Sequence, residues 1–197
     1  MARSRFIAPS AFFEAPAHLL ESLGFNAREA LLFSQIPALS RYLDRARYGK
    51  KPRLNHLAPA AEFLVGRYRG LAVERFYLLC LDGGGRLIEC RLLQTGTDDS
   101  APFYLRDVLA EIVRTRARAV VISHNHPNFS ARPSREDLAC TLELLGAVQP
   151  IGAVLLDHII VCGREYMSIR QHGFIRAQLW SAQAPESRLS QRWLDPA

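Results

Sequence analysis

The chain has 197 residues, and 49% of them are hydrophobic, which suffices for one substantial core with a small appendage. No apolar run reaches the ~18 residues of a membrane-spanning helix. The apolar start of the chain is broken by Pro9, Ser10 and Glu14, which argues against a signal peptide. The cysteines lie singly in apolar stretches without CxxC spacing, so we expect reduced thiols and a cytoplasmic protein; they are Cys80, Cys90, Cys140 and Cys162.

The first 56 residues predict a basic helical segment. They hold nine Lys/Arg and four Asp/Glu, a net charge of +5 out of +6 for the whole chain. Helices are expected over 11–23 and over 27–47, the second one capped by Asn26 and kinked or broken at Pro37. The basic run 41–53 could contact the phosphates of a nucleic acid, but we favour a solvated helix end and linker.

Residues 57–175 predict a mixed β-sheet flanked by helices, in the α/β or α+β class. The glycine-rich turn after Asp82 separates two strands of a hairpin. Helical and strand patterns then alternate; the expected elements are helix 59–69, strands 72–82 and 86–95, helix 103–116, strand 118–124, helix 134–147 and strands 152–162 and 165–169. The tail 176–197 has two prolines and few apolar residues, so we expect it to be loose.

The most informative stretch is HNHPNFSARPSRED, residues 124–137. His124 and His126 are two apart at the end of a buried strand, so their side chains leave the strand on one side. Asp137 falls in the first turn of the next helix. These three side chains are of the kinds that zinc accepts, and three protein ligands with one open position are typical of a catalytic zinc. The spacing therefore predicts one zinc ion per chain that activates water.

Other interpretations of the same residues exist. Ser134 and Asp137 have the spacing of a capping box, with Asp in place of the usual Glu, which by itself would explain both residues. A capping box does not require two histidines upstream, however, so their joint occurrence favours the metal site. Histidine pairs of this spacing also begin the metal sites of amidohydrolase barrels, but such a barrel needs about 250 residues.

At these residues the chain resembles the JAMM (JAB/MPN) metalloproteases. Residues 75–174 are similar to the RadC-type branch of that superfamily in particular. The matching pieces are ERFYLLCLD, QTGT, ISHNHP, RPSREDL and LLDHIIVCGREYMSI. In residues 1–56 there is no glycine hairpin like that of the helix-hairpin-helix region that RadC-type proteins commonly carry. Asn128 and Phe129 stand where relatives usually have Ser-Gly, and Leu105 stands where they usually have proline.

The resemblance implies a further residue and a reaction. JAMM enzymes carry a glutamate on an early strand, which hydrogen-bonds the metal-bound water, and Glu74 stands at that position. Alternation places Glu74 on the same face as Phe76. Glu74 would take the water's proton, and Ser134 would hydrogen-bond the developing oxyanion. The implied activity is hydrolysis of a peptide or isopeptide bond by a zinc metallopeptidase acting on a peptide or protein substrate.

Two questions stay open at the level of sequence. The fold could persist as a non-catalytic scaffold or DNA-repair-associated module that binds through the basic N-terminal segment. His158 interrupts an apolar strand, and it could orient a metal ligand from the outer shell or serve as a structural core histidine, which we favour.

Overall fold

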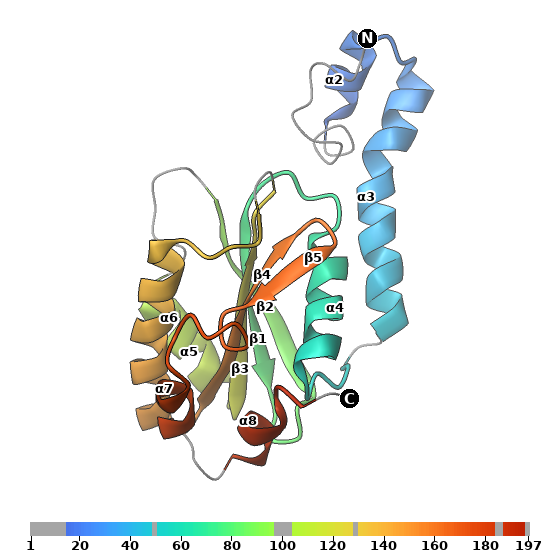
Figure 1. The fold of residues 1–197 in the computed structure, drawn as a ribbon. Helices are drawn as coiled ribbons and strands as arrows, with labels where there is room; N and C mark the ends of the chain where they lie inside the picture. Colours follow the sequence, from blue (N-terminus) through green and yellow to red (C-terminus); the bar gives the residue numbers. More distant parts are fainter. Residues whose placement is uncertain (1–14, 49–50, 97–103, 128–129, 184–186, 196–197) are drawn as a thin grey trace.

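The computed structural model describes residues 15–48, 51–96, 104–127, 130–183 and 187–195. They form one five-stranded mixed sheet in the order β2-β1-β3-β4-β5, with helices on both faces (Figure 1). Only β3 and β4 run parallel; the other neighbours are antiparallel. The strands are β1 (Arg75–Leu81), β2 (Leu87–Thr95), β3 (Ala119–Asn125), β4 (Val154–Cys162) and β5 (Glu165–Ser168). The predicted mixed sheet with flanking helices is confirmed.

The two faces of the sheet carry separate cores. Tyr77, Leu79 and Leu81 of β1 face α4 (Leu57–Tyr68), whose buried side includes Leu64. The alternate residues of β1 face the opposite side, where α5 (Leu105–Thr115), α6 (Arg135–Val148) and α7 (Ala177–Ala182) cover the sheet. Because side chains alternate along a strand, residues in phase with Phe76 point to the α6 side.

A register shift in β4 changes which residues face α6. Val120 of β3 pairs with Leu155 and Val121 pairs with Asp157, so Leu156 is an extra residue in β4. Such a bulge shifts the alternation by one position. As a result, Asp157 lies on the α4 side and His158 lies on the α6 side, close to the end of β3.

The N-terminal helices extend beyond the sheet. Asn26 caps α3 (Ala27–Tyr48) as predicted, because its Oδ1 accepts hydrogen bonds from the Arg28 and Glu29 amides at 3.1 and 3.0 Å. Of the two alternatives predicted for Pro37, a break is wrong, since α3 continues through that residue, and a kink stays a prediction. α3 lies beside α4, and the short α2 (Ala17–Ser22) packs against the upper part of α3 in Figure 1. Residues 1–14, which include the start of the predicted helix 11–23, lie outside the described residues. Residues 49 and 50 of the predicted linker lie outside them as well.

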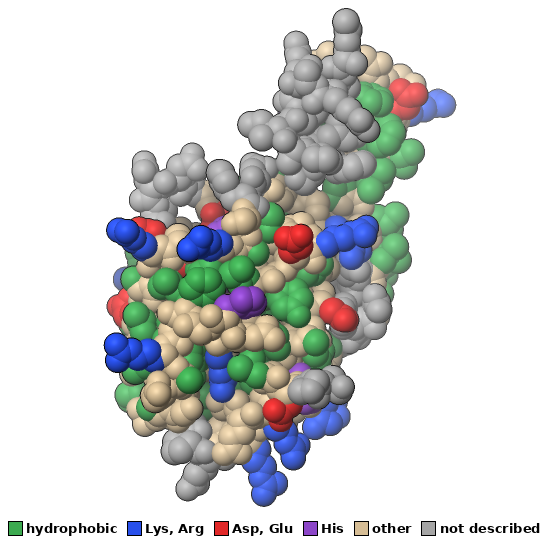
Figure 2. All heavy atoms as spheres, in the orientation of Figure 1, with side chains coloured by type: hydrophobic (Ala, Val, Ile, Leu, Met, Phe, Trp, Pro, Cys, Tyr) green, Lys and Arg blue, Asp and Glu red, His purple; other side chains and the backbone are tan. Residues whose placement is uncertain are grey.

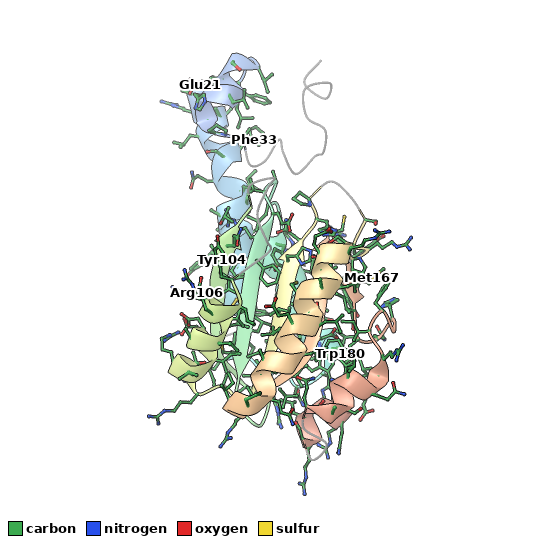
Figure 3. All side chains as sticks on the ribbon, turned by 90° about the vertical axis from the view of Figure 1, so that its left-hand side faces the viewer. Glu21, Phe33, Tyr104, Arg106, Met167 and Trp180 are labelled. Carbon is green, nitrogen blue, oxygen red and sulfur yellow. The ribbon has the colours of Figure 1, made fainter. Side chains whose placement is uncertain are left out.

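The described residues of the tail are not loose, which corrects the expectation for 176–197. Trp180 of α7 is 1% exposed and Trp193, just after α8 (Arg188–Arg192), is fully buried. Figure 3 shows Trp180 against the helical layer beside α6, and Gln183 bonds both backbone polar groups of Leu155. Few apolar residues suffice here because two of them are tryptophans, each of which buries a large area.

A buried carboxylate anchors the end of the tail. Asp157 accepts hydrogen bonds from the Trp193 indole at 2.9 Å, the Ser168 hydroxyl at 2.6 Å and the backbone amides of His158 and Arg170. Burial raises the pKa of Asp157 to about 6, although these donors favour its charged form. Asp157 is therefore ionised at pH 8, so each of the hydrogen bonds that it accepts is charge-assisted.

Replacing Trp193 by phenylalanine is expected to lower the free energy of unfolding by roughly 1.5–3 kcal/mol at pH 8, because the bond to a charged group is lost. Urea unfolding followed by circular dichroism measures the change. Trp180→Phe is a matched control, since the Trp180 indole has no hydrogen-bond acceptor among the described residues. Equal losses in the two variants would show that the indole bond to Asp157 contributes nothing beyond packing.

Two smaller expectations can be compared with the structure. The four cysteines form no disulfide, and burial raises the pKa of Cys80 and Cys90 to about 11, as expected for unreactive thiols. In the part of the chain that is described, no helix combines the length and the apolar character needed to cross a membrane.

Candidate metal centre

Two histidines meet at the end of β3. All seven residues of β3 are buried, and His124 is its penultimate residue. His124 is two residues after Ile122 in the strand, so both side chains face the α6 side. There the Phe76 ring stacks on the His124 ring, with 5.5 Å between the ring centroids. His126 follows the strand, and its Nε2 lies 2.9 Å from Nε2 of His124. The sequence prediction that these side chains leave the strand together is confirmed.

The first turn of α6 brings a carboxylate to the same point. Oδ1 of Asp137 lies 3.2 Å from Nε2 of His124, and Oδ2 lies 3.8 Å from Nε2 of His126. Ligand atoms about 2.05 Å from a tetrahedral zinc ion are roughly 3.3 Å apart, so the separations in this trio are close to those of a metal site. Burial opposes ionisation of Asp137, but where a proton instead of a metal ion sits on Nε2 of His124, its hydrogen bond and charge hold the pKa of Asp137 below the usual range.

A chain of hydrogen bonds fixes the tautomer of His124. The Thr141 hydroxyl donates to the Asp137 carbonyl at 2.5 Å, so its oxygen accepts the Nδ1–H of His158 at 2.7 Å. Nε2 of His158 is then bare and accepts the Nδ1–H of His124 at 2.9 Å. A neutral imidazole carries only one N–H. Nε2 of His124 therefore presents a lone pair toward His126 and Asp137.

His126 is fixed in the same way by a different partner. Its Nδ1 lies 2.9 Å from the Ser130 carbonyl oxygen, which can only accept a hydrogen bond, so Nδ1 carries the proton. Nε2 of His126 is thus bare as well. With both rings neutral, two lone pairs 2.9 Å apart beside a carboxylate repel one another unless a proton or a metal ion lies among them. The donor set fits a metal ion such as zinc.

A second group of possible ligands overlaps this one. His124, Asp137 and His158 are all buried and their ligand atoms lie within 4.8 Å of one another, so this group could bind a metal ion. The group formed with His126 is the better candidate for chemistry, because the His126 side chain is 16% exposed and offers a position open to solvent.

Glu74 lies beside the two histidines. It immediately precedes β1, is exposed, and its carboxylate lies within 4.8 Å of the ligand nitrogens of His124 and His126. The Gly96 amide donates to the Glu74 carbonyl at 2.7 Å. A side chain at Gly96 would put its Cβ 3.1 Å from the Glu74 Cβ, so glycine permits this close approach.

Asn125, the residue between the two histidines, holds the backbone on both sides of Glu74. Its Oδ1 accepts the Arg75 amide at 2.8 Å, and its Nδ2 donates to the Val73 carbonyl at 3.2 Å. Asn125 is 3% exposed, so these bonds are shielded from water. Asn125 therefore positions Glu74, a role that the sequence analysis did not assign.

Asn125→Ala is expected to lower kcat of any hydrolysis about tenfold or more while zinc content stays at the wild-type level, because Glu74 loses its fixed position. Steady-state kinetics with parallel elemental analysis measure both quantities. Asn125→Asp keeps one of the two bonds and should fall between alanine and wild type. Unchanged kcat in Asn125→Ala would exclude the positioning role.

Ser134 forms the capping box that its spacing suggested. Its Oγ accepts the Asp137 amide at 3.0 Å and donates to Oδ2 of Asp137 at 2.7 Å, while its own amide donates to the same oxygen at 2.7 Å. Ser134 thus caps α6 and orients the carboxylate of a candidate ligand. Its single hydroxyl proton is directed at Asp137, so the hydroxyl must rotate to donate to another acceptor.

Comparison with known proteins identifies the fold around this centre. Residues 54–174 match the RadC-like JAB domain. The chain belongs to this family. Its relatives include a UPF0758 protein of Rubrobacter xylanophilus, which is 33% identical over 83% of this chain and 72% of the relative. A UPF0758 protein of Shewanella woodyi is 40% identical over 58% of this chain and 51% of the relative. A UPF0758 protein of Stenotrophomonas maltophilia is 35% identical over 76% of this chain and 64% of the relative.

All the site residues lie inside the matched RadC-like JAB domain, whereas α3 precedes it. The structure brings together the five residues that the sequence singled out, namely Glu74, His124, His126, Ser134 and Asp137. It adds Asn125, Thr141 and His158. The contact of His158 with His124 favours the outer-shell interpretation over the structural role that the sequence analysis favours. Asn128 and Phe129 lie outside the described residues.

Proposed function

We propose that this chain is a zinc-dependent metallopeptidase or isopeptidase. One observation carries the proposal: the bare Nε2 atoms of His124 and His126 face one another at 2.9 Å, with the Asp137 carboxylate beside them. The proton on the other nitrogen of each ring is committed to an acceptor, so a proton or a metal ion must lie among these atoms, and two imidazole nitrogens with a carboxylate are ligands that zinc accepts. Membership in the RadC-like JAB family supports it further.

Zinc, when bound, polarises a carbonyl and makes a nucleophile available at neutral pH by lowering the pKa of water. The carboxylate of Glu74 accepts a proton as water attacks the amide carbonyl, and it then returns the proton to the leaving amine. Asn125 holds Glu74 in place for both transfers. The Ser134 hydroxyl turns from Asp137 and donates to the oxyanion that develops on the carbonyl.

The decisive experiment combines metal analysis with a hydrolysis screen. Purified protein is analysed for zinc and incubated with a peptide library and with isopeptide-linked lysine substrates, with and without a chelator. We expect about one zinc per chain and cleavage that the chelator abolishes and added zinc restores. Cleavage that survives removal of all metal would contradict the proposal, and so would zinc-loaded protein that cleaves neither class.

Ser134 separates a structural from a catalytic contribution. Ser134→Ala is expected to lose ~1 kcal/mol of stability as a missing cap and to lower kcat by about 10²-fold as a missing oxyanion donor. Ser134→Asp should preserve the cap yet remain catalytically poor, because its carboxylate opposes the oxyanion charge. Both variants should bind zinc. Wild-type turnover by Ser134→Asp would mean that the hydroxyl serves only to cap α6.

A further inference from the structure

A cavity of about 460 Å³ opens beside the metal centre. His126 lines it together with the neighbouring Pro127, and His126 is the residue that the cavity shares with the candidate centre. Part of its wall comes from α3, through Ile36 and Pro37, although α3 lies outside the matched family domain. A volume of this size is within the range of small-ligand sites.

A close contact brings α3 to this position. Gly70 follows α4 and has φ +71°, a conformation that favours glycine. A Cβ built on Gly70 would lie 3.3 Å from the Cβ of Pro37, so the absence of a side chain lets the α3 backbone approach. The Arg69 guanidinium also reaches the Ser40 hydroxyl of α3 at 3.5 Å. The wall of the cavity is therefore built by specific contacts between α3 and the segment after α4.

The chemistry of the cavity defines what fits it. Ile36, Pro37, Leu71 and Pro127 give it an apolar lining, and Ile36 remains 39% exposed. Arg69 and Arg164 also line the cavity, and no acidic side chain belongs to the lining among the described residues. An apolar side chain would bury its surface against the lining, whereas a cationic side chain would find no acidic partner in the described lining.

Figure 2 shows hydrophobic side chains along the outer part of α3 as well. Leu32, for example, is 65% exposed and does not line the cavity. α3 thus offers two apolar positions of different kinds, one in the cavity beside His126 and one in solvent. This difference supplies a matched pair of sites for substitution.

We propose that this cavity receives a branched apolar side chain of the peptide substrate next to the scissile amide, and that Ile36 of α3 determines this specificity. The inference rests on the proposed function, because it places the scissile bond at the centre formed by His126. It assigns to α3 a part in substrate selection. Peptides with a lysine or arginine at that position should be disfavoured.

Binding of hydroxamates to the zinc-loaded full-length protein tests the inference without requiring turnover. Acetohydroxamate reports binding to the metal alone. N-Acetyl-leucine hydroxamate and isobutyl-substituted succinamic hydroxamate place an isobutyl group on opposite sides of the metal-binding group, and each is paired with an aminobutyl counterpart. Isothermal titration calorimetry measures Kd for the wild type, for Ile36→Trp, whose larger side chain should occupy the part of the cavity next to α3, and for Leu32→Trp as the control.

We expect one isobutyl compound to bind the wild type at least tenfold more tightly than acetohydroxamate, because its side chain is removed from water. The aminobutyl counterpart should bind no better than acetohydroxamate. In Ile36→Trp the isobutyl advantage should fall below threefold, with zinc content and acetohydroxamate affinity unchanged. Leu32→Trp should keep the full advantage.

Several results would overturn the inference. These are equal affinities of the isobutyl compounds and acetohydroxamate in the wild type, failure of every hydroxamate to bind, or an isobutyl advantage that survives in Ile36→Trp. Failure of the proposed function has a different signature, because the isobutyl preference and its loss in Ile36→Trp would then be measured while no amide substrate is cleaved.

Discussion

Glu74→Gln is expected to lower kcat by roughly 10²–10⁴-fold, with the zinc content and the unfolding temperature of the wild type. Glutamine keeps the shape of the side chain and can still hydrogen-bond, but it cannot accept a proton from water. The structure gives this substitution a clean interpretation. The Glu74 backbone is held by Gly96, and its neighbours Val73 and Arg75 are held by Asn125, so the amide should occupy the same place as the carboxylate.

The measurement is steady-state hydrolysis of a substrate found in the screen, with elemental analysis of the same samples. Glu143→Gln is the control, because Glu143 is an exposed carboxylate on α6 outside the ligand groups. It should match the wild type. Wild-type turnover by Glu74→Gln would show that another group takes the proton.

The sequence was sufficient to locate the centre because its ligands are close together in the chain. His124 and His126 occur at the end of an apolar strand, and Asp137 occurs in the first turn of the following helix. Local periodicity therefore fixes the direction of all three side chains. Glu74 is fifty residues from His124, and its role could be predicted only from the family resemblance. Its place in the site depends on the antiparallel pairing of Phe76 with His124, which local periodicity does not reveal.

The outer part of the centre depends on features that a sequence pattern does not contain. The extra residue Leu156 in β4 turns His158 toward His124, and without this register shift the alternation would point it to the other face. Thr141 then completes the chain of hydrogen bonds from a different element. Such contacts depend on how strands and helices pack, which is decided by the whole fold.

The C-terminal tail is another feature that the sequence pattern did not predict. Its composition indicated a loose segment, yet Trp193 inserts its indole beside Asp157 of β4. The bonding partner is a buried carboxylate thirty-six residues earlier in the chain. Average polarity does not report a single anchoring contact of this kind.

The second large effect is expected on metal content. The wild type should bind about one zinc per chain, and His124→Ala, His126→Ala and Asp137→Ala should each lose most of it, because two remaining ligands are too few for a stable site. His126→Ala is the most informative variant. His126 belongs to the group with an open side and does not belong to the buried group of His124, Asp137 and His158.

His158→Gln provides the matched comparison for His126→Ala. The glutamine oxygen can still accept the Nδ1–H of His124, so zinc should remain bound, with an affinity reduced by no more than the 10–100-fold typical of lost outer-shell partners. Elemental analysis after dialysis gives occupancy, and the shift of the unfolding temperature with added zinc gives relative affinity. Full zinc in His126→Ala together with its loss in His158→Gln would place the metal in the buried group, where no ligand is open to solvent. Glu74 would then have no water to activate, and the hydrolytic proposal would fail with the assignment of the site.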